Sequence, residues 1–172
     1  MTASRIYLAG FDVFRADAYQ HGGYLKTLCE QAGLLGLFPL DLEIDDETGT
    51  SLQVARIYES NLSLLRSCDV VMANLDDFRG AGEPDSGTAF EVGVAVALNK
   101  LVFAYTEVIT PLIGRISHRR NSFGQAYCER GYRIEDFGLP MNLKLACSVT
   151  LVEGGPVECL AELVKVLDGL AG

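Results

Sequence analysis

The chain alternates short apolar runs with longer segments of helical spacing, and this alternation restricts its fold more than any other feature. Apolar strands are expected at residues 5–9, 34–38, 69–75, 100–105 and 148–153. Helices are expected at residues 16–32, 52–67, 86–99 and 140–147, and from residue 156 onward. Strands that alternate with helices predict a parallel sheet covered by helices on both faces. The expected fold class is therefore α/β, with a doubly wound five-stranded parallel sheet.

Two stretches interrupt this alternation. Residues 40–50 are acidic and predict a surface loop, whereas residues 106–139 lose all periodicity and are dominated by Gly, Arg and aromatic residues. A loop as long as the second is usually functional, as a lid or an interface. With 172 residues, no internal repeat and no composition break, the chain predicts a single domain over residues 1–172.

The net charge of the chain limits the kinds of molecule that it is expected to bind. The chain has 14 Lys and Arg against 23 Asp and Glu, a net charge of −9, and its longest basic run is the pair Arg119 and Arg120. This balance argues against nucleic-acid polymers and anionic membranes as partners. Small neutral or weakly charged ligands remain compatible.

The cysteine pattern predicts neither a metal site nor a cofactor. The five cysteines lie at least twelve residues apart, and the chain has only two histidines, so no metal-ligand spacing occurs. Scattered cysteines within apolar stretches are typical of reduced core thiols in a cytoplasmic protein. The apolar run at residues 6–10 is too short for a signal peptide, and no apolar stretch reaches the roughly 18 residues that span a bilayer.

The segment that indicates chemistry is residues 83–93 (EPDSGTAFEVG), which follows the predicted strand 69–75. It places two carboxylates, Asp85 and Glu91, at a strand–loop–helix crevice, where open α/β proteins bind ligands. Such a carboxylate can act as a nucleophile toward an electron-poor sugar carbon. In a second interpretation Thr88 caps the helix, Glu91 bonds back to it in a capping box, and Asp85 is a turn residue.

The first strand and the turn after it, residues 6–14 (IYLAGFDVF), contribute further candidates to this crevice. Tyr7 is either a site residue or a core aromatic with a satisfied hydroxyl. Asp12 is either a site residue or a surface turn residue. Phe14 is either part of the core or a platform on which a planar base stacks.

Five stretches together resemble the nucleoside 2-deoxyribosyltransferase family. They are residues 6–14, 61–73 (NLSLLRSCDVVMA), 78–80 (FRG), 85–93 (DSGTAFEVG) and 136–143 (DFGLPMNL), in the family's order. The most specific part is the Asp-(five residues)-Glu-x-Gly element. The resemblance implies a flavodoxin-like fold and a cofactor-free double displacement that moves 2-deoxyribose between purine or pyrimidine bases, as in nucleotide salvage.

The resemblance also implies a role for each matching residue. Glu91 matches the nucleophile that holds the deoxyribosyl group as an ester, and Tyr7 matches a tyrosine that positions it. Asp85 matches an aspartate that binds the sugar hydroxyls, and Gly87 of the same loop is expected at the substrate. Asp12 and Phe14 are expected base contacts.

Two further residues bear on assembly and on proton transfer. Asn142 matches an asparagine that relatives supply to a neighbouring subunit's pocket, which implies a homo-oligomer built from dimers, possibly a hexamer; the alternative is an ordinary helix N-cap. Asn61 stands where several family members have an aspartate proposed to protonate the leaving base. An amide cannot deliver that proton at neutral pH. Either Asp85 or water protonates the leaving base, or the base departs with only a hydrogen bond from Asn61.

Two other functions remain as alternatives. A related hydrolase cleaves 2'-deoxynucleoside 5'-monophosphates and has a serine at the position of Asp85. A carboxylate there would repel a phosphate dianion by about 1–4 kcal/mol, so Asp85 favours free nucleosides. The third function is a non-catalytic nucleotide-sensing module on the same fold.

Overall fold

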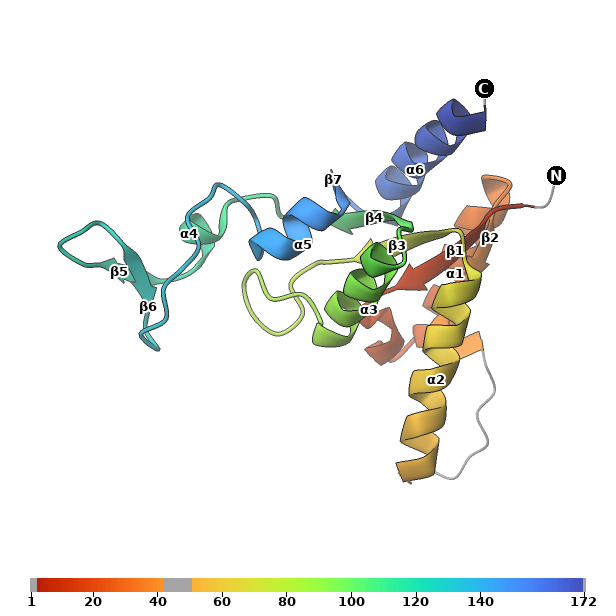
Figure 1. Ribbon diagram of the computed structural model, residues 1–172, viewed down its shortest axis with the longest axis horizontal. Helices are drawn as coiled ribbons and strands as arrows, with labels where there is room; N and C mark the ends of the chain where they lie inside the picture. The colour runs from red at the N-terminus through yellow and green to blue at the C-terminus, as the bar shows by residue number, and fades with distance from the viewer. Residues whose placement is uncertain (1–2, 42–50, 172) are drawn as a thin grey trace.

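The computed structural model describes residues 3–41 and 51–171. Five strands form one sheet in which every neighbouring pair is parallel (Figure 1). They are β1 (Arg5–Ala9), β2 (Leu35–Leu37), β3 (Val70–Asn74), β4 (Leu101–Thr106) and β7 (Thr150–Glu153). The spatial order β2-β1-β3-β4-β7 is that of flavodoxin-like folds, which confirms the predicted fold class.

Helices cover both faces of the sheet, and the alternation of side chains along β1 shows how. Ile6 and Leu8 pack in one core layer with Leu25 of α1 (Ala18–Gln31) and Leu163 of α6 (Pro156–Ala171). Tyr7 and Ala9 face the opposite layer. That layer is completed by α2 (Ser51–Ser67), α3 (Ser86–Ala97) and α5 (Leu143–Ser148). Tyr7 therefore lies on the same side of the sheet as α3.

The predicted strands and helices are confirmed, with ends that differ by up to three residues. Two short 3-10 helices add to them, η1 (Phe11–Phe14) and η2 (Pro39–Asp41). The acidic loop expected at residues 40–50 begins within η2, and residues 42–50 lie outside the described part of the chain. Gly33, with φ of +74°, ends α1 in the left-handed conformation that favours glycine at this position.

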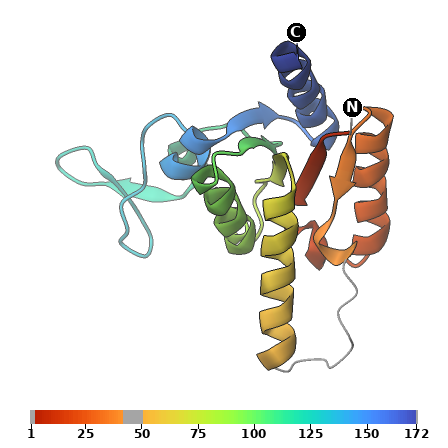
Figure 2. The same cartoon turned by 45° about the vertical axis from the view of Figure 1, so that its right-hand side comes forward.

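The stretch 106–139 contains regular structure that the sequence did not predict. It holds a short helix, α4 (Leu112–Arg115), and an antiparallel pair, β5 (His118–Arg120) with β6 (Ala126–Cys128). This hairpin projects away from the sheet in both views (Figures 1 and 2). A small core of Leu112, Ala126 and Ile134 stabilises it. The expectation of an irregular segment was wrong because β5 is short and charged, so it has no apolar alternation.

The first half of α2 extends beyond the edge of the sheet (Figures 1 and 2). Leu62 and Leu65, in the second half, are buried against the sheet, whereas Val54, Ile57 and Tyr58 are exposed. The exposed Tyr58 ring lies 6.1 Å from the Phe90 ring of α3, so the first half of α2 contacts α3 without being buried by it.

Candidate active site

The closest contact between predicted site residues joins β1 to α3. Glu91 lies in the second turn of α3, and its Oε1 accepts a hydrogen bond of 2.5 Å from the Tyr7 hydroxyl. Tyr7 is fully buried in the sheet, so its hydroxyl is held at a defined position. The structure thus brings together two residues 84 positions apart in the sequence. Tyr7 is a buried aromatic, as one interpretation expected, and its hydroxyl is satisfied by the candidate nucleophile.

Burial weakens the acidity of the Glu91 carboxyl more than any other effect. It raises the pKa of this carboxyl to about 7, the hydrogen bond from Tyr7 opposes the rise, and the charge of Asp85 adds to it. The pKa of Tyr7 is raised as well, first by burial and then by the charge of Glu91. Near neutral pH, Glu91 is therefore poorly solvated and exchanges readily between its ionised and neutral forms, which suits a carboxylate that forms and releases an ester.

Asp85 is the N-cap of α3. Its Oδ2 accepts from the Thr88 amide at 2.8 Å and from the Thr88 hydroxyl at 3.1 Å. The capping-box interpretation was therefore wrong, because Asp85 caps the helix and Thr88 is its partner. A Cβ on Gly87 would lie 3.0 Å from Asp85 Oδ2, so a small residue there leaves room for the cap. The cap fixes the carboxylate beside the start of α3, on the helix that carries Glu91.

Asp12 is a buried carboxylate with partners from two other elements. Asn74, at the end of β3, donates to its Oδ2 at 3.0 Å, and His21 Nε2 of α1 lies 3.1 Å from its Oδ1. Only 4% of Asp12 is exposed, so the alternative of a surface turn residue was wrong. Gly10 makes this arrangement possible, because a Cβ there would lie 2.6 Å from Asp12 Oδ2.

Phe14 is exposed rather than part of the core, at 63% of its surface. Its ring stacks on Phe78 with a centroid distance of 5.5 Å, and Phe11 stacks on Phe78 at 5.0 Å. The guanidinium of Arg79 lies 4.4 Å from the centre of the Phe78 ring. These aromatic rings join the turn after β1 to the loop after β3, at the edge where ligands of open α/β folds bind.

Sequence reasoning assigned no role to three residues of this region, His21, Asn74 and Phe78. Phe78 was part of a quoted motif, and Asn74 was visible as a polar residue at the end of an apolar strand. His21 carried no signal, because only the fold brings it to Asp12. Asn61, the remaining base candidate, is half-buried on α2, which packs beside α3 and β1.

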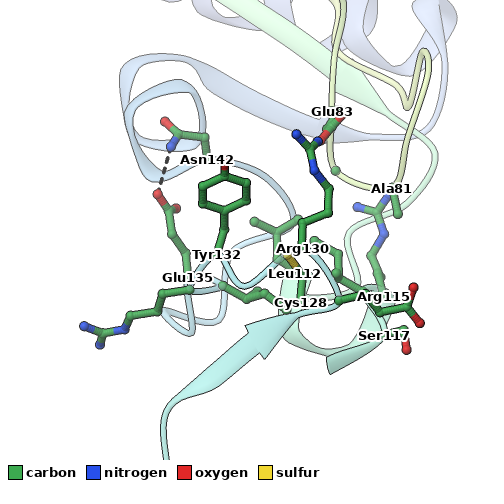
Figure 3. Close-up of a pocket in the computed structure, with 15 residues that line it drawn as sticks. Ala81, Glu83, Leu112, Arg115, Ser117, Cys128, Arg130, Tyr132, Glu135 and Asn142 are labelled. Carbon is green, nitrogen blue, oxygen red and sulfur yellow. Dashed lines mark hydrogen bonds between the residues drawn. The ribbon is translucent and has the colours of Figure 1, made fainter. Parts of the chain in front are cut away.

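Asn142 is the N-cap of α5. Its Oδ1 accepts from the Lys144 amide at 3.0 Å, and its Nδ2 donates to Glu135 Oε1 at 2.8 Å. It borders a cavity of about 600 Å³ between the projecting hairpin region and the loop before α3 (Figure 3). The cavity is lined by residues 81–83, 115–117, 128–130 and 132–135 among others, but not by Tyr7, Asp85 or Glu91. Within one chain, Asn142 therefore has the expected helix-cap geometry and faces a separate cavity.

Residues 3–41 and 51–171 contain no group of three or more His, Cys, Asp or Glu side chains placed to hold a metal ion. Over the same ranges, no helix has both the length and the apolar character needed to cross a membrane.

Three solved structures resemble the fold of this chain. A 2-desoxiribosyltransferase from Leishmania mexicana matches with a TM-score of 0.74 and 28% identity, over 94% of this chain and 97% of that one. A conserved protein from Enterococcus faecalis matches with a TM-score of 0.60 and 20% identity, over 96% and 99% of the two chains. A 2-deoxyribosyltransferase from Bacillus psychrosaccharolyticus matches at 0.52 and 21%, over 61% and 74%. The last two likenesses concern the fold alone.

Sequence comparisons agree with the structural ones. An uncharacterized protein of Schizosaccharomyces pombe is 34% identical over 127 residues, which are 70% of this chain and 59% of that protein, so the chain spans less than two thirds of its relative. The model of the family described as nucleoside 2-deoxyribosyltransferase matches residues 6–144, a range that includes the buried Tyr7–Glu91 pair. The chain therefore belongs to the nucleoside 2-deoxyribosyltransferase family.

Proposed function

We propose that the protein transfers 2-deoxyribose between nucleobases through a covalent ester on Glu91. The observation that carries this proposal is the 2.5 Å hydrogen bond from Tyr7 to a buried Glu91 whose pKa is raised to about 7. A carboxylate in such a place can attack an oxocarbenium-like carbon and still depart as a leaving group.

In the first step a Glu91 oxygen bonds to the anomeric carbon of a 2'-deoxynucleoside. The glycosidic C–N bond breaks, and the base departs with the electron pair and takes up a proton from Asp85 or water. In the second step a nitrogen of the incoming base attacks the same carbon, the ester bond breaks, Glu91 is regenerated as a carboxylate, and the base gives up one N–H proton to the group that protonated the first base. Two inversions give net retention. Because Tyr7 holds Oε1, Oε2 is assigned to the attack.

The neighbouring residues bind the two halves of the substrate. Asp85, held by its cap contacts to Thr88, accepts hydrogen bonds from the sugar hydroxyls, and Gly87 lets the sugar approach the start of α3. Phe14 offers an exposed face to the base. Asp12, the other expected base contact, is buried and both of its oxygens have partners, so no direct contact with the base is assigned to it. Asn61 is assigned a hydrogen bond to the base and not proton delivery, since an amide is not an acid at neutral pH.

Asn142 completes the site from a second subunit in this proposal. The side chain can donate to one sugar oxygen and accept from another without adding charge beside two carboxylates. Its position at a cavity that excludes Glu91 supports a contact made in another copy of the chain. The proposed assembly is a homo-oligomer built from dimers.

Incubation with thymidine and adenine, followed by chromatography, tests the proposed function. Deoxyadenosine and thymine are expected in equal amounts, because the deoxyribosyl group passes from one base to the other. Free thymine and deoxyribose without deoxyadenosine would show a hydrolase instead. Unchanged thymidine and adenine would leave the non-catalytic binding module as the better account.

The pH dependence of kcat/KM for thymidine is expected to report the ionisation of Glu91. The attacking form is the carboxylate, so kcat/KM should fall about tenfold per pH unit below a pKa of about 7. Tyr7→Phe removes a donor that lowers this pKa and should move the acid limb to higher pH. Asp85→Asn removes a charge that raises it, keeps a good N-cap, and should move the limb to lower pH. Shifts in the same direction, or none, would contradict the assignment of this limb to Glu91.

A further inference from the structure

Three elements, η1, β3 and α1, meet at the buried carboxylate of Asp12. Asp12 lies in η1, directly after β1, and only 4% of it is exposed. Its two oxygens have separate partners: Asn74 Nδ2 donates to Oδ2 at 3.0 Å, and His21 Nε2 lies 3.1 Å from Oδ1. Both partners are side-chain nitrogens from other elements, β3 and α1. A carboxylate held in this way ties η1 to its neighbours on both sides.

The same short turn carries the aromatic rings of the site. Phe11 and Phe14 are the first and last residues of η1, and both rings stack on Phe78. Asp12 lies between them in the chain, and its carbonyl accepts from the Arg15 amide at 3.2 Å, which closes the turn. The position of the Asp12 carboxylate therefore sets where the exposed ring of Phe14 lies against Phe78.

We propose that His21 and Asn74 are positioning residues that act through Asp12 to fix Phe14 and Phe78 as the stacking surface for the acceptor base. The inference rests on the proposed function and extends it to two residues outside the Glu91 cluster. Stacking on aromatic rings tolerates both purines and pyrimidines, because every base has a π-face. The platform is thus expected to accept bases of both classes, with an affinity that depends on how rigidly the rings are held.

Substitution of His21 tests this inference with a matched pair of variants. His21→Leu removes the donor to Asp12, whereas His21→Gln retains a nitrogen near the place of Nε2. His21→Leu should raise the KM for adenine about tenfold and change kcat less than about twofold, and His21→Gln should restore most of the loss. Asn74→Leu should resemble His21→Leu. Thr27→Ala, an exposed change on the same helix, is the control and should leave both constants unchanged.

A double-mutant cycle with Phe14 separates positioning from general destabilisation. If His21 acts through the platform, His21→Leu should add little to the effect of Phe14→Leu on the KM for adenine. Fully additive effects, or a fall in kcat alone that His21→Gln does not restore, would overturn the inference.

Calorimetric binding of free adenine gives a readout that does not depend on transfer. His21→Leu should weaken adenine binding by the same factor of about ten, relative to wild type. A wild type that binds adenine but transfers nothing would refute the proposed function while the weaker binding by His21→Leu still supported the platform. Equal adenine affinity in wild type, His21→Leu and Asn74→Leu would refute the platform.

Discussion

Glu91→Gln is expected to lower base exchange by at least about 10⁴-fold, since removal of a nucleophile typically eliminates nearly all of the catalytic rate. Glutamine has nearly the same shape and can accept the hydrogen bond that Tyr7 donates to Glu91 Oε1. It cannot form the ester intermediate. The measurement is the initial rate of deoxyadenosine formation from thymidine and adenine.

The stability of the same variant provides the control. The folded state raises the pKa of Glu91 from 4.5 to about 7, so the fold favours the neutral side chain. The stability that Glu91 contributes is complete below pH 4.5 and is lost as pH rises through about 7. Glutamine does not ionise, so Glu91→Gln should be more stable than wild type at pH 8, by on the order of 3 kcal/mol. At pH 4.5 the two proteins should unfold at similar urea concentrations.

The expected loss of base exchange and the expected pH-dependent gain in stability would together exclude a merely structural role for Glu91. If Glu91 were only a helix-start residue, its substitution should lower the free energy of unfolding by about 0.5–2 kcal/mol and leave the enzyme active. Retained exchange by Glu91→Gln, or a stability difference that does not depend on pH, would contradict the assignment.

Mixed oligomers of Glu91→Ala and Asn142→Ala subunits are expected to regain activity that neither variant has alone. A shared site takes Glu91 from one subunit and Asn142 from its partner. Half of randomly mixed dimers contain both variants, and each of these has one intact site, so recovery should approach about one quarter of wild-type activity. The measurement is the rate of base exchange after co-refolding, with subunit mixing verified by mass spectrometry.

A cap-preserving variant separates the two roles of Asn142. The Asn142 side chain caps α5 through the Lys144 amide, and Asn142→Ala should destabilise this helix by about 1 kcal/mol. Asn142→Ser retains an N-cap oxygen but lacks the amide donor, so it should fold like wild type and remain impaired in transfer. No recovery in verified mixed oligomers, or full activity of Asn142→Ser, would mean that the asparagine is only a cap.

The sheet could be predicted from the sequence because its signals are local. Each strand is an apolar run closed by Gly, Pro or a polar residue, and each long helix has its own 3.6-residue spacing. The hairpin β5–β6 escaped prediction because its short strands depend on tertiary contacts of Leu112 and Ile134. Alternation alone does not reveal such strands.

The candidate site also combines residues predictable from local sequence with contacts that only the fold creates. Motif spacing and the family resemblance predicted Glu91, Tyr7 and Asp85 as site residues, but that Asp85 rather than Thr88 caps α3 was visible only in the hydrogen bonds. His21 and Asn74 reach Asp12 from elements far away in the sequence. The fold brings these side chains together, so their contacts with Asp12 cannot be predicted from residue types and local spacing.

Trapping of the intermediate tests the central claim most directly. A 2-fluoro-2-deoxy nucleoside should form the ester and release it slowly, because fluorine disfavours the oxocarbenium-like transition state. Intact mass spectrometry of the wild type should show one sugar added per chain, and peptide mapping should place it on Glu91. Addition of adenine should remove the label, and Glu91→Gln should not acquire it. Label on another carboxylate, or base release from the wild type without any label, would contradict the proposed covalent mechanism.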